Sequence, residues 1–347
     1  MAGDFDIVSV HTREIRGAGG IPVAEVEIVL ENGAHGRACA PLHSASKEES
    51  HPENRNHVFS FEKFNSPKAC ELLREALLFE DSSDQRKTDR ALTEMAGCCQ
   101  TEIPFSGLIT AASMSVAKAA AAGHRLPLYR YLGGIAPGKL PVPLVTMLHF
   151  SNKSEPNQSG EKRIHENGEV MVTPLNCSDY SEGFRRCCEV RQTLKKLLTM
   201  CSHNSAVSPS EPFHIETKDQ EEASGYVTDA IRLSRNRPEI DIAVITSTTD
   251  QELFSPEQLP VAPFTIGHYL TVTAAHDALE SAKSKGLRTA LVTGPQQTEE
   301  IFAADFAAAF RCDYLKIENP DKLDQITKYN EILRLEDWMK HHYLQFS

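Results

Sequence analysis

The side chains that could do chemistry are spread along this chain without the spacing of a catalytic or zinc-binding motif. None of the 14 histidines stands four residues from another, so the HxxxH and HExxH arrangements are absent. The nine cysteines form no CxxC pair, and the adjacent pairs at 98–99 and 187–188 are poorly placed to bridge each other. Gly294-Pro295 lacks the spacing of a P-loop or a GxGxxG fingerprint. We therefore expect reduced thiols, an exposed histidine pair at 341–342 and no metal site.

Composition and charge narrow the class of protein. The chain has 347 residues, of which 40% are hydrophobic and 24% charged, as is usual for a globular protein. Its net charge of −12 argues against binding to nucleic acid or to an anionic membrane, because both need a positive field. No apolar stretch is long enough to span a bilayer, and the first residues, MAGDFDIVSV, lack the pattern of a secretory signal. We expect a cytoplasmic protein with no nucleic-acid or membrane partner.

Functional side chains in the first part of the chain must be positioned by a β-meander followed by helices. Alternation of apolar residues predicts strands at 5–10, 24–30 and 34–40. The Asn32-Gly33 pair predicts the hairpin turn between the last two strands. Periodicity predicts helices at 66–80, 85–96 and 107–122. The last helix is rich in Ala and must pack closely, so residues 1–138 are predicted to form an α+β domain.

Residues 139–347 are predicted to form a second domain of the α/β class. The sequence predicts strands at 142–148, 169–173, 288–293 and 313–317. It predicts a loop at 201–222 and helices at 180–200, 273–285, 298–310 and 321–340. Strands and helices alternate with short connections in the last third, which indicates parallel strands. That pattern fits either a doubly wound sheet or part of a (β/α)₈ barrel.

One predicted helix carries a run of positive charge opposite its apolar side. The run lies on helix 180–200 and consists of Arg185, Arg186, Arg191, Lys195 and Lys196. We interpret it as a solvated face rather than a phosphate or nucleic-acid patch, because charge runs on amphipathic helices usually face solvent.

Six segments, in the same order, resemble the enolase family, the magnesium-dependent lyases of glycolysis. The resemblance is carried by 115–134 (SVAKAAAAGHRLPLYRYLGG), 25–28 (EVEI), 141–143 (PVP), 169–174 (EVMVTP), 298–305 (TEEIFAAD) and 328–336 (KYNEILRLE). It implies a small α+β N-terminal domain over 1–138 followed by a TIM-type (β/α) barrel over 139–347.

The second domain is too short for a complete barrel. A full barrel takes about 250 residues, more than remain after residue 138. Residues 247–254 resemble the middle of the family's barrel, whereas Ile266-Gly267 already resembles its late part. We therefore predict an incomplete barrel that lacks roughly two βα units near 250–265.

The resemblance also defines the chemistry that an active site would perform. The family removes a proton next to the carboxylate of 2-phosphoglycerate and expels hydroxide, giving phosphoenolpyruvate. It uses two Mg²⁺ ions held by three carboxylates, with a lysine as the base. The first carboxylate corresponds to Ile245 here, and the other two fall in the missing segment with the lysine. The resemblance thus implies a dismantled site with no cofactor, Mg²⁺ being expected only if the activity survives.

Four residues stand where the family has functional side chains. Glu169 matches the family's glutamate, and Glu211 lies nearest its general acid, so both are candidate catalytic residues. Lys316 matches the substrate-binding lysine, and Ser46 stands near the metal-binding serine of the family's lid, with Ala45 as the other alignment. Each could equally be a structural or surface residue, since most partners have changed.

Two further positions have lost the side chain that the family carries. Lys153 replaces a histidine, and residues 292–295 replace the Ser-His-Arg-Ser stretch of the phosphate-binding loop. The imidazole and guanidinium that would hold a phosphate are therefore missing.

We expect a catalytically inactive enolase-like protein that acts as a structural or interaction component. A shortened barrel would expose strand edges and apolar helix faces, so we expect a protein partner or a second copy to cover them. One alternative is a Mg²⁺-dependent lyase on 2-phosphoglycerate with a rearranged site. Another is a sensor that binds a phosphate ligand without chemistry.

Overall fold

The fold is that of a computed structural model, which describes residues 3–41, 67–98, 105–135, 139–152, 167–200, 213–217, 219–248, 261–293 and 298–343. The chain divides into two compact units. Unit 1 comprises residues 1–139, 264–281 and 294–310. Unit 2 comprises residues 140–263, 282–293 and 311–347.

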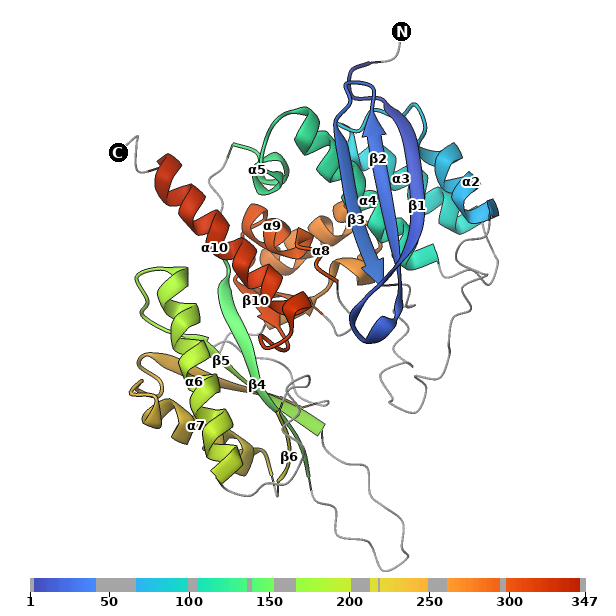
Figure 1. The fold of residues 1–347 in the computed structure, drawn as a ribbon. Coiled ribbons are helices and arrows are strands. Elements are labelled where there is room, and N and C mark those ends of the chain that lie inside the picture. Colours follow the sequence, from blue (N-terminus) through green and yellow to red (C-terminus); the bar gives the residue numbers. More distant parts are fainter. Residues whose placement is uncertain are drawn as a thin grey trace, which may run out of the picture. The chain divides into compact units, whose positions relative to one another are not determined.

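Unit 1 contains a three-stranded antiparallel sheet in the order β1-β2-β3 (Figure 1). Its elements are β1 (Ile7–Arg16), the short 3-10 helix η1 (Ala18–Gly20), β2 (Pro22–Leu30) and β3 (His35–Pro41). The turn after β2 has Gly33 at φ +81°, and Asn32 Oδ1 accepts a hydrogen bond from the Ala34 N–H at 2.9 Å. The predicted meander is confirmed, but β1 runs on to Arg16 because its pairing with β2 continues as far as Pro22.

Unit 1 also contains helices, and the Ala-rich one packs most extensively against the sheet. They are α2 (Pro67–Leu77), α3 (Gln85–Cys98), α4 (Phe105–Gly123), α5 (Leu128–Gly133), η4 (Ile266–Tyr269), α9 (Phe302–Ala309) and the first part of α8 (Val272–Ser284). A Cβ atom on Gly36 of β3 would lie 2.2 Å from Ala119 N and 2.3 Å from Ser115 O of α4. The absence of a side chain at Gly36 therefore lets the helix backbone touch the strand.

Unit 2 is built on a mixed sheet whose path runs β7-β5-β4-β10-β9-β8. Its strands are β4 (Val142–Asn152), β5 (Asn167–Pro174), β6 (Phe213–Thr217), β7 (Ile242–Thr248), β8 (Val261–Phe264), β9 (Arg288–Thr293) and β10 (Tyr314–Ile317). Its main helices are α6 (Tyr180–Met200), α7 (Gln220–Leu233) and α10 (Leu323–Tyr343). As predicted, β10 pairs in parallel with β9, and it also pairs in parallel with β4. β5 is antiparallel to both of its neighbours, β4 and β7.

This sheet is an incomplete TIM-type barrel, as predicted. Within the described residues its path contains six strands, whereas a closed barrel has eight. The two end strands, β7 and β8, follow each other in the chain, so the break lies where the sequence predicted missing units. β6 pairs in parallel with the far half of β4 and lies off the main path.

Several predicted boundaries were wrong. The expected loop at 201–222 includes strand β6 and the start of α7, whose N-cap Asp219 accepts a hydrogen bond from the Glu222 N–H at 2.8 Å. The helix expected from residue 298 begins only at Phe302, whose N–H is bound by the Glu300 side chain at 3.0 Å. Side chains that bind free N–H groups at the start of a helix help to set where it can begin.

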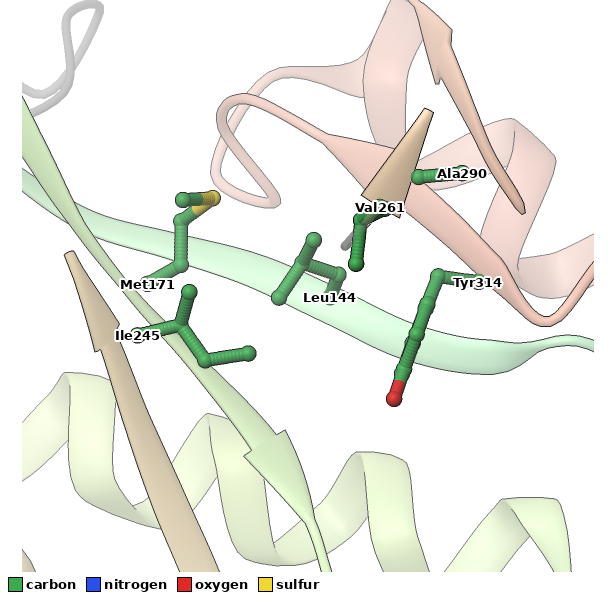
Figure 2. Close-up of a cluster of buried hydrophobic side chains, with 6 residues drawn as sticks. All are labelled: Leu144, Met171, Ile245, Val261, Ala290 and Tyr314. Carbon is green, nitrogen blue, oxygen red and sulfur yellow. The ribbon is translucent and has the colours of Figure 1, made fainter. Parts of the chain in front are cut away.

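Inward-facing side chains of unit 2 form an apolar layer across the sheet (Figure 2). The apolar layer consists of Leu144, Met171, Ile245, Val261, Ala290 and Tyr314. Its members come from six strands and none is more than 8% exposed, as in the packed interior of a barrel. None of the helices in the described ranges has the length and hydropathy needed to cross a membrane.

Candidate functional site

A second layer on the same face of the unit 2 sheet is polar. Because side chains alternate along a strand, residues two positions from the apolar layer face the same way. On four strands these are Thr146 on β4, Glu169 on β5, Ser247 on β7 and Lys316 on β10, which we call the polar layer, whereas β8 and β9 carry Pro263 and Val292 at the equivalent positions. It lies toward the C-terminal ends of the parallel strands β4 and β10, the end at which TIM barrels carry their active sites.

Two of the residues predicted from the sequence meet in this layer. Lys316 Nζ donates a hydrogen bond to Glu169 Oε1 and forms an ion pair with it. Thr146 Oγ1 donates to the other carboxylate oxygen at 3.3 Å. The side chains of Lys316 and Glu169 are 10% and 19% exposed, so the pair is largely desolvated. Each residue therefore neutralises the charge that the other would offer to a ligand.

A histidine that the sequence did not single out stands beside this ion pair. His149 on β4 is paired in register with Glu169 on β5 and with His214 on β6. A bulge in β4 between Thr146 and Leu148 shifts the register at this point. Burial lowers the pKa of His149; the nearby Glu169 opposes that shift, and Lys316, His214 and Arg191 add to it. His149 therefore favours its neutral form.

Arg191 is the largest departure from the sequence-based interpretation of the basic helix. It was expected on a solvated face, but it is 3% exposed. Its guanidinium donates to the carbonyls of Thr146 and Met147, at 3.1 and 3.3 Å, and to Asn319 Oδ1 at 2.9 Å. It also donates to Asp321 through Nε and Nη2. Arg191 therefore binds α6 to the middle of β4 and to the segment after β10.

Three other residues of that basic face are exposed as predicted, whereas the Arg186 side chain is only 17% exposed. Arg185 and Arg186 pair with Glu189 and Glu182 one helical turn away, and Arg185 is well exposed. Lys195 and Lys196 are exposed. Acidic neighbours balance the arginines, so the face does not form a concentrated anion-binding patch.

The described residues of unit 2 do not fit the Mg²⁺ ions that the resemblance implies. Ile245 is 7% exposed within the apolar layer and has no atom that can bind a hard cation. Glu169, the carboxylate of the polar layer, is engaged by Lys316. Across the described part of the chain, no group of three or more His, Cys, Asp or Glu side chains is arranged to hold a metal.

The remaining predicted site residues cannot be placed with these. Glu211, Ser46 and its alternative Ala45 lie outside the described residues, as does Lys153. At the position of the phosphate loop, Val292 is paired in register with Lys316 and Thr293 Oγ1 contacts Gln325 of α10 at 3.2 Å. Neither supplies a positive charge to the polar layer.

Resembling segments in unit 1 carry polar residues with architectural contacts. Glu300 accepts hydrogen bonds from the Cys39 N–H at 3.1 Å and from the Phe302 N–H at 3.0 Å, and it pairs with Lys118 of α4. Asp305 accepts from the Tyr129 N–H at 3.2 Å, at the first turn of α5. These carboxylates join β3, α4, α5 and α9, so their persistence in the sequence needs no catalytic explanation.

Comparison with protein families finds two matching domain models. The model of the enolase N-terminal domain matches residues 7–132, and that of the enolase C-terminal TIM barrel domain matches residues 264–344. Together the two matches cover more than half of the chain. Lys316 lies within the second match, whereas Glu169 lies between the two. With both domain matches, the open barrel and its two-layered interior, the chain belongs to the enolase family.

Proposed function

We propose that this enolase-family chain does not form phosphoenolpyruvate and serves as a structural or interaction component, with a protein partner or a second copy. The observation that carries the proposal is the ion pair between Glu169 and Lys316 above the apolar layer, which includes Ile245, the residue that the family resemblance aligns with a metal ligand. The polar layer thus holds one negative and one positive side chain, and each neutralises the charge of the other.

This charge balance is the wrong one for the family's reaction. The substrate carries a phosphate and a carboxylate, and the enolate-like intermediate adds further negative charge at the reacting carbon. Stabilising it requires a concentration of positive charge, which the family obtains from metal ions. A single lysine that is already paired with Glu169 cannot supply that charge.

The direct test is the absorbance assay for phosphoenolpyruvate, on the purified full chain with 2-phosphoglycerate and excess Mg²⁺. We expect no rate above that of buffer, while an active enolase in the same cuvette shows that the assay works. Turnover that Glu169→Gln abolishes would overturn the proposal. It would instead establish a lyase with ligands recruited from residues such as Glu211.

The interaction role has its own measurement. Light scattering coupled to gel filtration gives the mass of the particle in solution, and a mass of two chains would support a second copy as the partner. A monomer at every concentration would count against the second copy. A monomer that also gave no stoichiometric complex in a native cell extract would contradict the interaction role.

A further inference from the structure

We infer that the ion pair between Glu169 and Lys316 is a clasp that holds the open sheet of unit 2 curled. The inference concerns folding and not catalysis, so it stands or fails separately from the proposed function. Glu169 lies on β5 and Lys316 on β10, and these strands do not pair with each other. Both pair with β4, which runs between them.

A contact of this kind favours curvature. Neighbouring strands are about 4.8 Å apart, so side chains two strands apart on a flat sheet start about 10 Å from each other. They approach when the sheet bends toward the face that carries them. Thr146 of β4, which lies between the two strands, donates a hydrogen bond to the same carboxylate at 3.3 Å. The three side chains together therefore span β5, β4 and β10 on the concave face.

An open barrel needs such a contact more than a closed one does. In a closed barrel the ring of strand pairing fixes the curvature, whereas the described path here ends at β7 and β8. Curvature must then be held by side chains inside the sheet. The apolar layer does this at one level (Figure 2), and the clasp does it in the polar layer above.

The desolvation of the pair makes the inference testable by substitution. Removing one partner leaves a buried charge uncompensated, whereas removing both leaves none. We therefore compare Lys316→Met, Glu169→Gln and the double variant in the full chain. Lys316→Arg keeps the charge, and Arg185→Met removes half of an exposed pair on α6 of the same unit.

Two measurements separate a clasp from an ordinary buried pair. The first is the urea midpoint from the fluorescence of Trp338, the single tryptophan, which lies on α10 in unit 2. The second is hydrogen exchange in β7 and β8, the end strands. We expect each single variant to lower the midpoint more than the double variant does. We also expect faster exchange at both end strands in the singles and in the double.

The controls fix how the results are interpreted. Lys316→Arg should retain most of the protection, and Arg185→Met should match the wild type in both measurements. A double variant that exchanges at β7 and β8 like the wild type would overturn the inference. So would singles whose faster exchange stays within β5 and β10. If a single variant does not fold, the double variant and Lys316→Arg still decide between these outcomes.

Discussion

Replacing Ile245 by Asp restores the type of side chain that the enolase family uses to hold its first metal ion, and it tests whether the site is truly dismantled. Ile245 is 7% exposed and packs in the apolar layer with Leu144 and Met171. An aspartate at this position would be surrounded by apolar side chains. A metal ligand would instead need further charged side chains nearby to help bind the ion. We expect the carboxyl group to destabilise unit 2 and to gain nothing from Mg²⁺.

The size of the effect follows from two contributions. Losing most of a buried Ile side chain costs about 2–5 kcal/mol of unfolding free energy. A buried aspartate takes up a proton, because burying its charged form would cost more free energy. For a carboxyl group with an ordinary pKa near 3.9, staying protonated at pH 7 costs about 4 kcal/mol. Ile245→Asp should therefore lose about 6–9 kcal/mol at pH 7, which is comparable with the whole stability of many domains.

The sign of the pH dependence distinguishes this cause from simple loss of packing. Burial raises the pKa of the introduced carboxyl, so the unfolded state loses its proton first and the destabilisation grows as the pH rises above about 4. Ile245→Asn has a similar size and no titration, so its loss should stay constant with pH. Ile245→Val should cost about 0.5–1.5 kcal/mol.

The assay is urea unfolding followed through Trp338, at pH 5 and pH 7.5, with and without excess Mg²⁺. The reasoning would be refuted if Mg²⁺ restored the midpoint of Ile245→Asp and left Ile245→Asn unchanged. That result would mean that other ligands reach this position and that the cavity can still bind a cation. A loss equal in Asp and Asn variants at both pH values would refute the proposed burial of charge.

Three further predictions concern packing and titration. Gly36→Ala would place a Cβ 2.2 Å from Ala119 N, so we expect a large fall in the thermal midpoint. Gly97 has open space around it, so Gly97→Ala should instead stabilise α3 by about 0.5–1 kcal/mol. Burial lowers the pKa of His149, so stability should fall as the pH drops below about 6.5, and His149→Gln should flatten that part of the pH profile measured by urea unfolding. Burial raises the pKa of the Cys39 thiol to about 12. Mass spectrometry after brief alkylation at pH 8 should therefore find Cys39 unmodified in the native chain and modified in urea. Rapid labelling of the native chain would contradict its burial.

The parts of the fold that could be predicted from sequence are those with local signals. The meander of unit 1 follows from alternation and from Asn32-Gly33, and the parallel strands β9 and β10 follow from their regular alternation with helices. The family resemblance placed Glu169 and Lys316 in one site, and the structure brings them into contact. The position of the barrel's break also followed from sequence, because segments resembling the middle and late barrel stand too close together.

The parts that were missed depend on contacts between distant segments. β6 alternates buried and exposed residues as a strand does, but it has only five residues, and its pairing with the far half of β4 could not be read from so short a pattern. Arg191 looks like any arginine on a charged helix, and its burial depends on carbonyls of β4 and on Asn319 and Asp321 far along the chain. His149 gains its neighbours through a bulge that the apolar run of β4 does not reveal.

The polar residues that persist in this chain share a property that catalysis does not require. Glu300 and Asp305 bind backbone N–H groups at the starts of helices, and Lys118 pairs with the first of them. Glu169 and Lys316, which match the family's site, are likewise each satisfied by a side chain of this chain. A buried charge whose partner is removed destabilises the fold by several kcal/mol, so such pairs serve stability whether or not a reaction is catalysed. Ile245 is the opposite case: it stands where the family resemblance aligns a metal ligand, and as an apolar side chain within the apolar layer it needs no charged partner.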